Sequence, residues 1–538
     1  MAAASWSPRL SLACAAALLV LAGAHFAWRV QPILRYEQTA PPFFLDATSC
    51  TRFTSTPGAI LDYLAAAVAQ LNSSLWLGAL AFVALLGGIF PGARRALAGL
   101  DGRWTTALAC GLVALLAALP GRYENEMERT LMGILLSLGA VSAWLAVPAR
   151  MRVLRPASAG VLTVALFFVA GPVPAALSAS LMALQELLVN RRPWLAAACV
   201  PALLVVPLWW WFHPAFDPLA AVSNWGGGWT RTLHTLAFLL VPLGLVTGIV
   251  LTRWTGDRNQ PQPGWLPGSV GLAVVLALWG VTLDTPRKAL ARFEHAARQQ
   301  QWDRALTIAQ NLPSWTPAAR VQLTRVLFHA GRLPEDLFTF PQKRGADLLP
   351  GYEVGLDVAR TVASSLLELG QVHLAEHMAH ESLELEGAKP DILRLLACIN
   401  ILKGQPEAAR VFLLRLRLTP FHRREADRQL QLLAADPTGA NQPELNAIRT
   451  RLPRTDEPDY RLATESLLRQ LLRANPTNRM AFHYLLAHRL LNAQTEELAT
   501  DLQRLRLFGN PPLPRPCEEA LLLHQSSSAP ADLHPHKV

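Results

Sequence analysis

The chain has 538 residues, of which 51% are hydrophobic and 16% are charged. Soluble proteins usually contain about 25% charged residues, so this composition, with a mean hydropathy of +0.24, excludes a wholly soluble protein. The net charge of +10 does not indicate a nucleic-acid partner, because the arginines of the first half lie in short loops between apolar runs.

Nine apolar runs in the first half of the chain approach the roughly 20 residues that a membrane-spanning helix needs. They are predicted at residues 9–28, 75–91, 104–120, 130–148, 157–171, 173–189, 193–212, 232–252 and 266–283. The fifth and sixth are separated only by "GPVP", which fits either a hairpin between two spans or a kink in one segment. The first also resembles a signal peptide, but because many spans follow, we interpret it as an uncleaved anchor.

Arginines occur in alternate loops between these runs. The basic loops contain Arg94, Arg95 and Arg103, then Arg150, Arg152 and Arg155, then Arg191 and Arg192, and finally Arg253 and Arg258. Short loops with arginine stay in the cytoplasm. The pattern therefore predicts a cytoplasmic N-terminus and, after nine crossings, an extracytoplasmic location for the chain beyond residue 284.

The stretch "PGAILDYLAAAVAQL" at 57–71 belongs to the predicted outer loop, residues 29–74. Its larger apolar residues recur at helical spacing and form one face: Ile60, Leu64, Val68 and Leu71. Thr56 and Pro57 predict the start of this helix. A short helix with an apolar stripe beside a membrane fits the bilayer interface, either as a linker that anchors the loop or as the roof of a membrane-surface site.

Helical repeats are predicted in residues 284–505. Two pairs of small residues recur at an interval of 34 residues: Gly370 and Gly404, and Ala375 and Ala409. A small residue at a helix turn and a second one where two helices cross are typical of tetratricopeptide-like repeats. Such repeats stack into an α-solenoid whose concave face binds proteins. Residues 506–538 are predicted to form a capping segment and a disordered tail.

The expected fold is all-α, with a polytopic transmembrane bundle of about nine spans in residues 1–283 followed by the tetratricopeptide-like α-solenoid. This order of features, with "YEQ" at 36–38, "PGAILDYLAAAVAQL" at 57–71 and "LFTFPQ" at 337–342, resembles an uncharacterised family of bacterial multi-span membrane proteins, a domain-of-unknown-function family with a helical-repeat C-terminus. The resemblance implies a bacterial inner-membrane location and implies no activity.

Few motifs in the chain indicate chemistry. "HLAEH" places His373, Glu376 and His377 in the H-x-x-E-H arrangement of inverted zinc peptidases. We interpret this as a coincidence, because Ala375 is also the crossing residue of the repeat. Glu186 lies in an apolar run, but close enough to its inner end to reach water. Isolated cysteines and the lack of GxxxxGK[ST], GxGxxG and GxSxG motifs predict neither a metal nor another cofactor.

Polar and aromatic residues gather in the predicted outer loops. They are Tyr36, Glu37, Asp46, Asp62, Glu124, His213, Asp217, Trp225, Trp229 and Arg231. The aromatic residues are typical of the belt at a membrane interface. The arrangement is also similar to membrane glycosyltransferases that use polyprenyl-phosphate sugar donors. That resemblance implies an acidic base early in the first outer loop, matched by Glu37 and second by Asp46, although this loop has no adjacent Asp-Asp or Asp-Glu pair.

The sequence thus favours an integral inner-membrane protein whose extracytoplasmic repeats bind or organise cell-envelope proteins. The bilayer and a protein on the concave face are its expected partners. The alternative is an envelope glycosyltransferase that binds a lipid-linked sugar, with an outer-loop carboxylate as base. Whether the protein is an enzyme stays open at this point, since the likeness in architecture is only an analogy.

Overall fold

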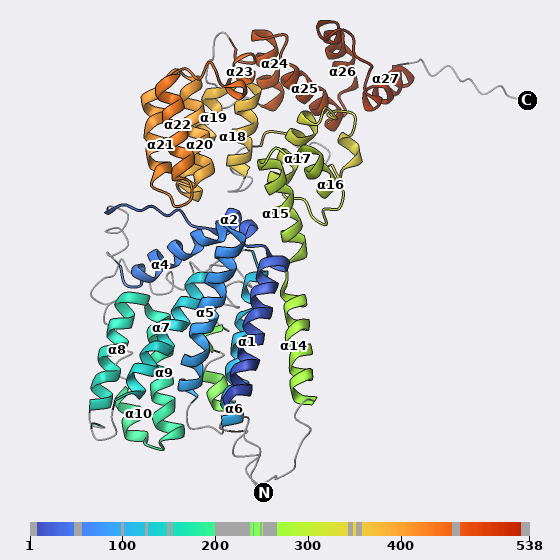
Figure 1. Cartoon of the computed structure of the whole chain (residues 1–538). Coiled ribbons are helices and arrows are strands. Elements are labelled where there is room, and N and C mark those ends of the chain that lie inside the picture. The colour runs from blue at the N-terminus through green and yellow to red at the C-terminus, as the bar shows by residue number, and fades with distance from the viewer. Residues whose placement is uncertain are drawn as a thin grey trace, which may run out of the picture. The chain divides into compact units, whose positions relative to one another are not determined.

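The computed structural model describes residues 8–47, 56–97, 102–123, 127–147, 151, 154–199, 237–239, 242–247, 250, 266–342, 348–350, 358–453 and 463–528. These residues form helices and contain no strand, which confirms the all-α class (Figure 1). The chain divides into two compact units, Met1–Lys288 and Ala289–Val538, which we call unit 1 and unit 2.

Unit 1 is built from long apolar helices joined by short ones. Its helices are α1 (Pro8–Ala24), α2 (Pro32–Thr39), α4 (Ala59–Ala69), α5 (Leu75–Ala96), α6 (Gly102–Leu116), α7 (Met127–Leu145), α8 (Leu154–Ala170), α9 (Pro172–Leu184), α10 (Pro193–Cys199) and α14 (Leu266–Thr282). Short π or 3-10 turns extend them at η1 (His25–Val30), η2 (Gln70–Ser73), η3 (Leu119–Gly121) and η5 (Gln185–Val189).

Three helical stretches within the described residues are long and apolar enough to cross a membrane: Leu12–Val30, Leu75–Ala96 and Pro172–Val189. The expected count of nine is not reached. The helices α6, α8 and α14 have 15, 17 and 17 residues, which at 1.5 Å per residue is shorter than a hydrocarbon core of about 30 Å. The first turn of α7 contains Glu128 and Arg129, and most of 193–212 and 232–252 lies outside the described residues.

The "GPVP" segment separates two antiparallel helices and does not kink a single one. The helix α8 ends at Ala170, α9 begins at Pro172, and the two pack against each other. Gly171 between them has φ +89°, a left-handed backbone that glycine adopts without steric cost. The chain therefore reverses direction at this point.

The helix α4 covers one end of this bundle and contacts α7 and α8. It begins at Ala59, after Gly58 with φ +91°, so the expected start at Thr56 and Pro57 is slightly early. Its buried side consists of Leu61, Ala65, Ala66 and Ala69. The apolar stripe with Ile60 and Leu64 lies on the other side, where both residues are exposed, because the alanines allow the closer approach to the bundle.

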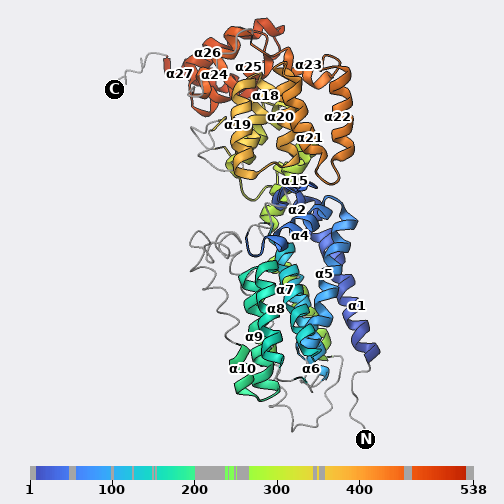
Figure 2. The same cartoon turned by 90° about the vertical axis from the view of Figure 1, so that its left-hand side faces the viewer.

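Unit 2 contains shorter, amphipathic helices. They are α15 (Thr285–Arg298), which begins in unit 1, α16 (Trp302–Ala309), α17 (Pro317–His329), α18 (Val358–Leu369), α19 (Val372–Glu386), α20 (Pro390–Leu402), α21 (Pro406–Arg417), α22 (Arg423–Ala435), α23 (Pro443–Arg449), α24 (Thr464–Ala474), α25 (Arg479–Leu491), α26 (Thr495–Leu502) and α27 (Arg515–Ser528). From α18 to α22 each helix packs against the next (Figures 1 and 2).

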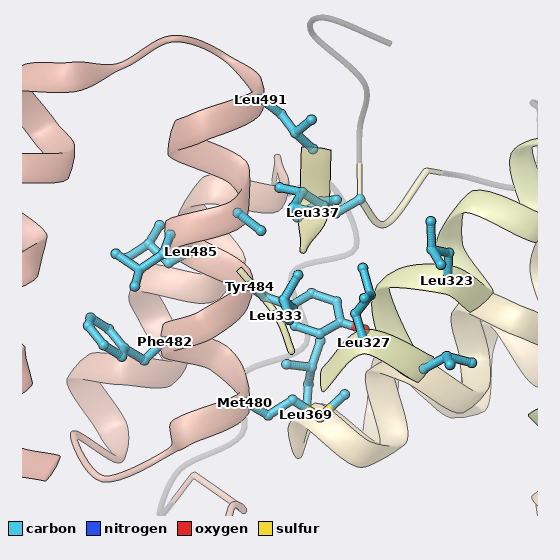
Figure 3. Packing of buried hydrophobic residues seen from close by; sticks show 14 of the residues in the cluster. Leu323, Leu327, Leu333, Leu337, Leu369, Met480, Phe482, Tyr484, Leu485 and Leu491 are labelled. Carbon is cyan, nitrogen blue, oxygen red and sulfur yellow. The ribbon is translucent and has the colours of Figure 1, made fainter. Parts of the chain in front are cut away.

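The first and last helices of unit 2 share one hydrophobic core. Leu327 and Leu333 pack with residues more than a hundred positions later, including Tyr484 and Leu491 of α25, and Leu369 of α18 joins them (Figure 3). In a strict solenoid each repeat touches only its neighbours. The contacts of α17 and α18 with α25 depart from that pattern, because the chain returns to bury the apolar faces of its first helices.

Candidate functional site

The predicted outer-loop residues only partly fall within the described structure. Tyr36 and Glu37 lie on α2, Asp46 follows it, and Asp62 lies on α4; all four are partly exposed. The remaining ones lie outside the described residues: Glu124, His213, Asp217, Trp225, Trp229 and Arg231. The side of α2 that enters the bundle carries Arg35 and not Glu37.

Arg35 is the centre of a buried polar cluster in unit 1. Its side chain is fully buried, and Nη1 donates hydrogen bonds to the carbonyl oxygens of Pro120 at 3.1 Å and Arg122 at 3.0 Å. Its Nη2 lies 4.0 Å from Oε2 of Glu128. The guanidinium therefore ties α2 to η3 and to the start of α7.

Glu128 has a second partner in the same cluster. Asn72 Nδ2 donates to its Oε1 at 2.6 Å, and Glu128 is buried. Nearby, the hydroxyl of Tyr123 donates to the carbonyl oxygen of Val30. Because Arg35, Asn72 and Glu128 are all withdrawn from solvent, the cluster can clamp α2, η2 and α7 together but offers no surface to a substrate.

A second ion pair fastens α4 to the bundle. Arg129 Nε lies 2.7 Å from Oδ1 of Asp62, and burial raises the pKa of Asp62 although Arg129 opposes this shift. Beside the pair is a cavity of about 10 Å³ lined by Leu61, Arg129, Ala170, Pro172, Val173, Pro174 and Phe238. A volume of this size holds about one water molecule, so it does not accommodate a sugar donor.

Glu186 does not reach water, contrary to the sequence interpretation. Its side chain is fully buried on η5, and Arg155 Nη1 lies 2.8 Å from its Oε1. Trp144 Nε1 donates to the carbonyl oxygen of Arg155 at 3.1 Å, which holds the start of α8 against the end of α7. The ion pair with Arg155 therefore stabilises the Glu186 carboxylate in place of the water that it was expected to reach.

A row of ion pairs connects α18, α20 and α22, the first helix of each of three successive helix pairs in unit 2. Arg394 on α20 contacts Asp391 of its own helix at 2.5 Å and Glu425 on α22 at 2.7 Å. Asp391 also lies 3.7 Å from Arg298 on α15 and 3.9 Å from Arg360 on α18. We call Arg298, Arg360, Asp391, Arg394 and Glu425 the charge ladder.

The ladder follows the repeat register. Arg360, Arg394 and Arg428 are spaced 34 residues apart on α18, α20 and α22, as are Asp391 and Glu425. Burial alone would raise the pKa of Asp391, but Arg298, Arg394 and Arg360 hold it at about 2. The acids stand in the first turns of α20 and α22, where the helix dipole favours negative charge.

A second charged cluster lies at the other end of α18. Arg325 binds both carboxylate oxygens of Glu368, at 2.6 and 2.9 Å, and His329 Nε2 lies 2.8 Å from Oε2. The His329 ring stacks on Trp302 with a centroid separation of 4.5 Å. Burial alone would raise the pKa of Glu368, but Arg325 and His329 hold it at about 2. These contacts join α16, α17 and α18.

The residues of the "HLAEH" motif do not converge in the structure. Glu376 accepts a hydrogen bond from Lys403 Nζ at 2.6 Å, and His377 lies 4.0 Å from Glu381 of its own helix. Among the described residues, no group of three histidine, cysteine or carboxylate side chains could hold a metal ion. The motif therefore contributes to the helix surface and to the contact between α19 and α20.

Sequence reasoning missed the Arg35 cluster and the charge ladder. Arg35 and Glu128 are 93 residues apart and carry no shared local signal. The ladder had such a signal in the sequence. An acidic residue is followed three positions later by arginine at Asp391 and Arg394, and the pattern recurs 34 residues later, which is also the interval between Gly370 and Gly404.

The chain belongs to the family of unknown function DUF6057, whose sequence profile matches residues 5–538. This match confirms the resemblance to an uncharacterised family. No curated protein and no solved structure matches the chain significantly.

Proposed function

We propose that this protein is a membrane-anchored scaffold: unit 1 holds it in the bilayer and unit 2 binds a cell-envelope protein. The observation that carries the proposal is the charge ladder, which repeats with the register of the helix pairs across α18, α20 and α22. Repeated polar groups along one row of stacked helices suit an extended partner that contacts several repeats at once.

The proposed topology has a cytoplasmic N-terminus, an odd number of crossings and an extracytoplasmic unit 2 in a bacterial inner membrane. Alternate arginine-rich loops support it. Exposed tryptophans at helix ends, Trp28, Trp76 and Trp194, suit an interfacial belt. Reporter fusions after residue 538 test it: an extracytoplasmic enzyme reporter should be active and a fluorescent reporter that folds only inside should be dark. The reverse pattern would contradict the topology.

The repeat register of the ladder is tested through Arg428, which lies on α22 at the position equivalent to Arg360 and Arg394. Its side chain is exposed, so the substitution Arg428→Glu should leave the helix content unchanged while it reverses the charge at the third arginine position. We expect at least a fivefold loss of the partner that co-purifies with the full-length protein. Arg428→Lys keeps the charge and is the matched control. Equal recovery with both variants would overturn the role of the ladder in binding.

The second candidate is the glycosyltransferase with Glu37 as base. The presence of α2 and α4 as helices in the first outer loop, with exposed Ile33, Ile60 and Leu64, supports it as an interfacial lid. The water-sized cavity beneath α4 speaks against it, since α4 would have to move to admit a donor. Glu37→Gln at normal protein level should abolish an envelope glycan; a glycan profile identical to wild type would exclude this function.

A further inference from the structure

The solvent side of α21 carries an apolar stripe bordered by arginines. Val411 is 63% exposed and Leu414 is 41% exposed. At 100° per residue, Arg410 and Arg417 fall on one side of Leu414 and Arg415 falls on the other. The helix therefore presents large apolar side chains to solvent between two cationic edges.

The stripe continues into the turn between α21 and α22. Phe421 is 51% exposed, and its φ of +64° is a left-handed backbone that a bulky residue rarely adopts. The next residues, Arg423 and Arg424, are exposed as well. The exposed aromatic ring of Phe421 has an unfavourable contact with water, so transfer of this ring into an apolar environment would lower its free energy.

We propose that the α21 surface, formed by Val411, Leu414 and Phe421 with the neighbouring arginines, docks on an anionic lipid bilayer. A helix that lies on a membrane buries its apolar face at the boundary of the acyl chains, and its cations meet the lipid phosphates. Residues 406–428 contain six arginines and three carboxylates. Glu425 is engaged by Arg394 outside this segment, and the other two carboxylates, Glu407 and Asp427, pair with Arg410, Arg417 and Arg423 within it, so the segment keeps an excess of positive charge.

The chain itself favours a bilayer over an acidic protein as the occupant. The apolar helix α14 ends at Thr282 and α15 begins at Thr285, so only two residues separate this apolar helix of unit 1 from the helix that leads into unit 2. A tether this short keeps lipid at high effective concentration, whereas a protein partner must be recruited from solution. This step rests on the membrane anchoring of the proposed function.

Photo-crosslinking in the full-length protein tests the docking. Benzoylphenylalanine would replace Phe421, Leu507 or Leu80 in separate variants, each reconstituted in nanodiscs of phosphatidylcholine and phosphatidylglycerol. Leu507, at 55% exposed, matches Phe421 in exposure, and Leu80, at 66% exposed on the candidate membrane span α5, reports on the anchor. After irradiation, mass spectrometry should find lipid adducts at 421 and 80 at least tenfold more often than at 507.

Each failure has a separate meaning. Lipid adducts at 80 with a yield at 421 no higher than at 507 would overturn the docking and leave the anchor intact. Absence of adducts at 80 would overturn the anchor itself. A protein adduct at 421 in native membranes, in place of lipid, would show that the occupant is a protein.

The part played by charge is tested on the arginines that flank the stripe. Arg410→Glu with Arg423→Glu, both exposed residues, should lower the lipid adduct at 421 severalfold when phosphatidylglycerol is present. The same loss in phosphatidylcholine alone, or no loss at all, would overturn the anionic character of the docking surface.

Discussion

The two units use the same charged residue types in opposite surroundings. In unit 1, Arg35 and Glu128 are buried between helices, where Arg35 donates to the carbonyl oxygens of Pro120 and Arg122 and lies 4.0 Å from Glu128. In unit 2, Asp391 and Arg394 each have several charged partners and keep part of their surface in solvent. Breaking a buried pair leaves a charge without solvent, whereas a partly exposed network replaces a lost partner with water or with a neighbour. The same substitution should therefore cost far more in unit 1.

The largest effect is expected for Arg35→Met. It removes the donors to Pro120 and Arg122 and leaves Glu128 buried, and loss of one partner of a buried pair costs about 3–5 kcal/mol. Thermal unfolding of the full-length protein in detergent micelles measures it. The double variant Arg35→Met with Glu128→Met should recover much of the loss, because neither charge then stays buried. An unchanged melting temperature for the single variant would contradict the clamp.

Glu368 tests whether burial or the unit decides the energetic effect of losing a charge, because it is a mostly buried charge in unit 2. Its folded pKa of about 2 lies below the ordinary 4.5, so ionised Glu368 stabilises the fold at neutral pH. That stability should fall as the pH drops from about 4.5 to about 2, and by linkage it amounts to about 3 kcal/mol.

Glu368→Gln should therefore be less stable than wild type at pH 7 and should approach it near pH 2. Unfolding in denaturant at several pH values measures this convergence. Parallel curves for the two proteins over the whole range would show that the contacts of Arg325 and His329 with Glu368 do not stabilise the folded state.

The smallest expected effect is the difference in stability loss between two glycine-to-alanine variants at equivalent repeat positions. A Cβ on Gly370 would lie 2.5 Å from the carbonyl oxygen of Arg451, while one on Gly404 would meet nothing within 4 Å. Both have positive φ, +98° and +71°. Gly404→Ala should cost about 1–2 kcal/mol from the left-handed backbone alone, and Gly370→Ala should cost more. Equal melting temperatures for the two variants would contradict the close contact at Gly370.

Local patterns in the sequence were sufficient for the helical class and for several helix boundaries. The small residues Gly370 and Gly404 do fall at the turns after α18 and α20, because a positive φ suits glycine wherever it occurs. The segment around residues 57–71 is a helix, as its spacing predicts. Its apolar stripe could be found from the sequence, but which side packs on the bundle could not, since both sides are apolar.

In the described part of the chain, counting apolar residues overestimated the number of membrane spans. A hydropathy window measures composition, whereas the length of a helix depends on where glycine, proline and buried charges interrupt it. The helices α6 and α14 are shorter, at 15 and 17 residues, than the apolar runs predicted at 104–120 and 266–283. Arg129 and Glu128 likewise occupy the first turn of α7.

The sequence by itself determined the helices, the 34-residue repeat and the family, because these depend on neighbours within a few turns. Only the tertiary structure decided that Arg35 meets Glu128 and that α17 and α25 share a core that contains Tyr484. Such contacts join residues as far apart in the chain as Leu327 and Tyr484 and leave no periodic trace. Which residues become partners depends on the surfaces that the folded chain brings together. Burial of these contacts then makes the loss of one partner strongly destabilising.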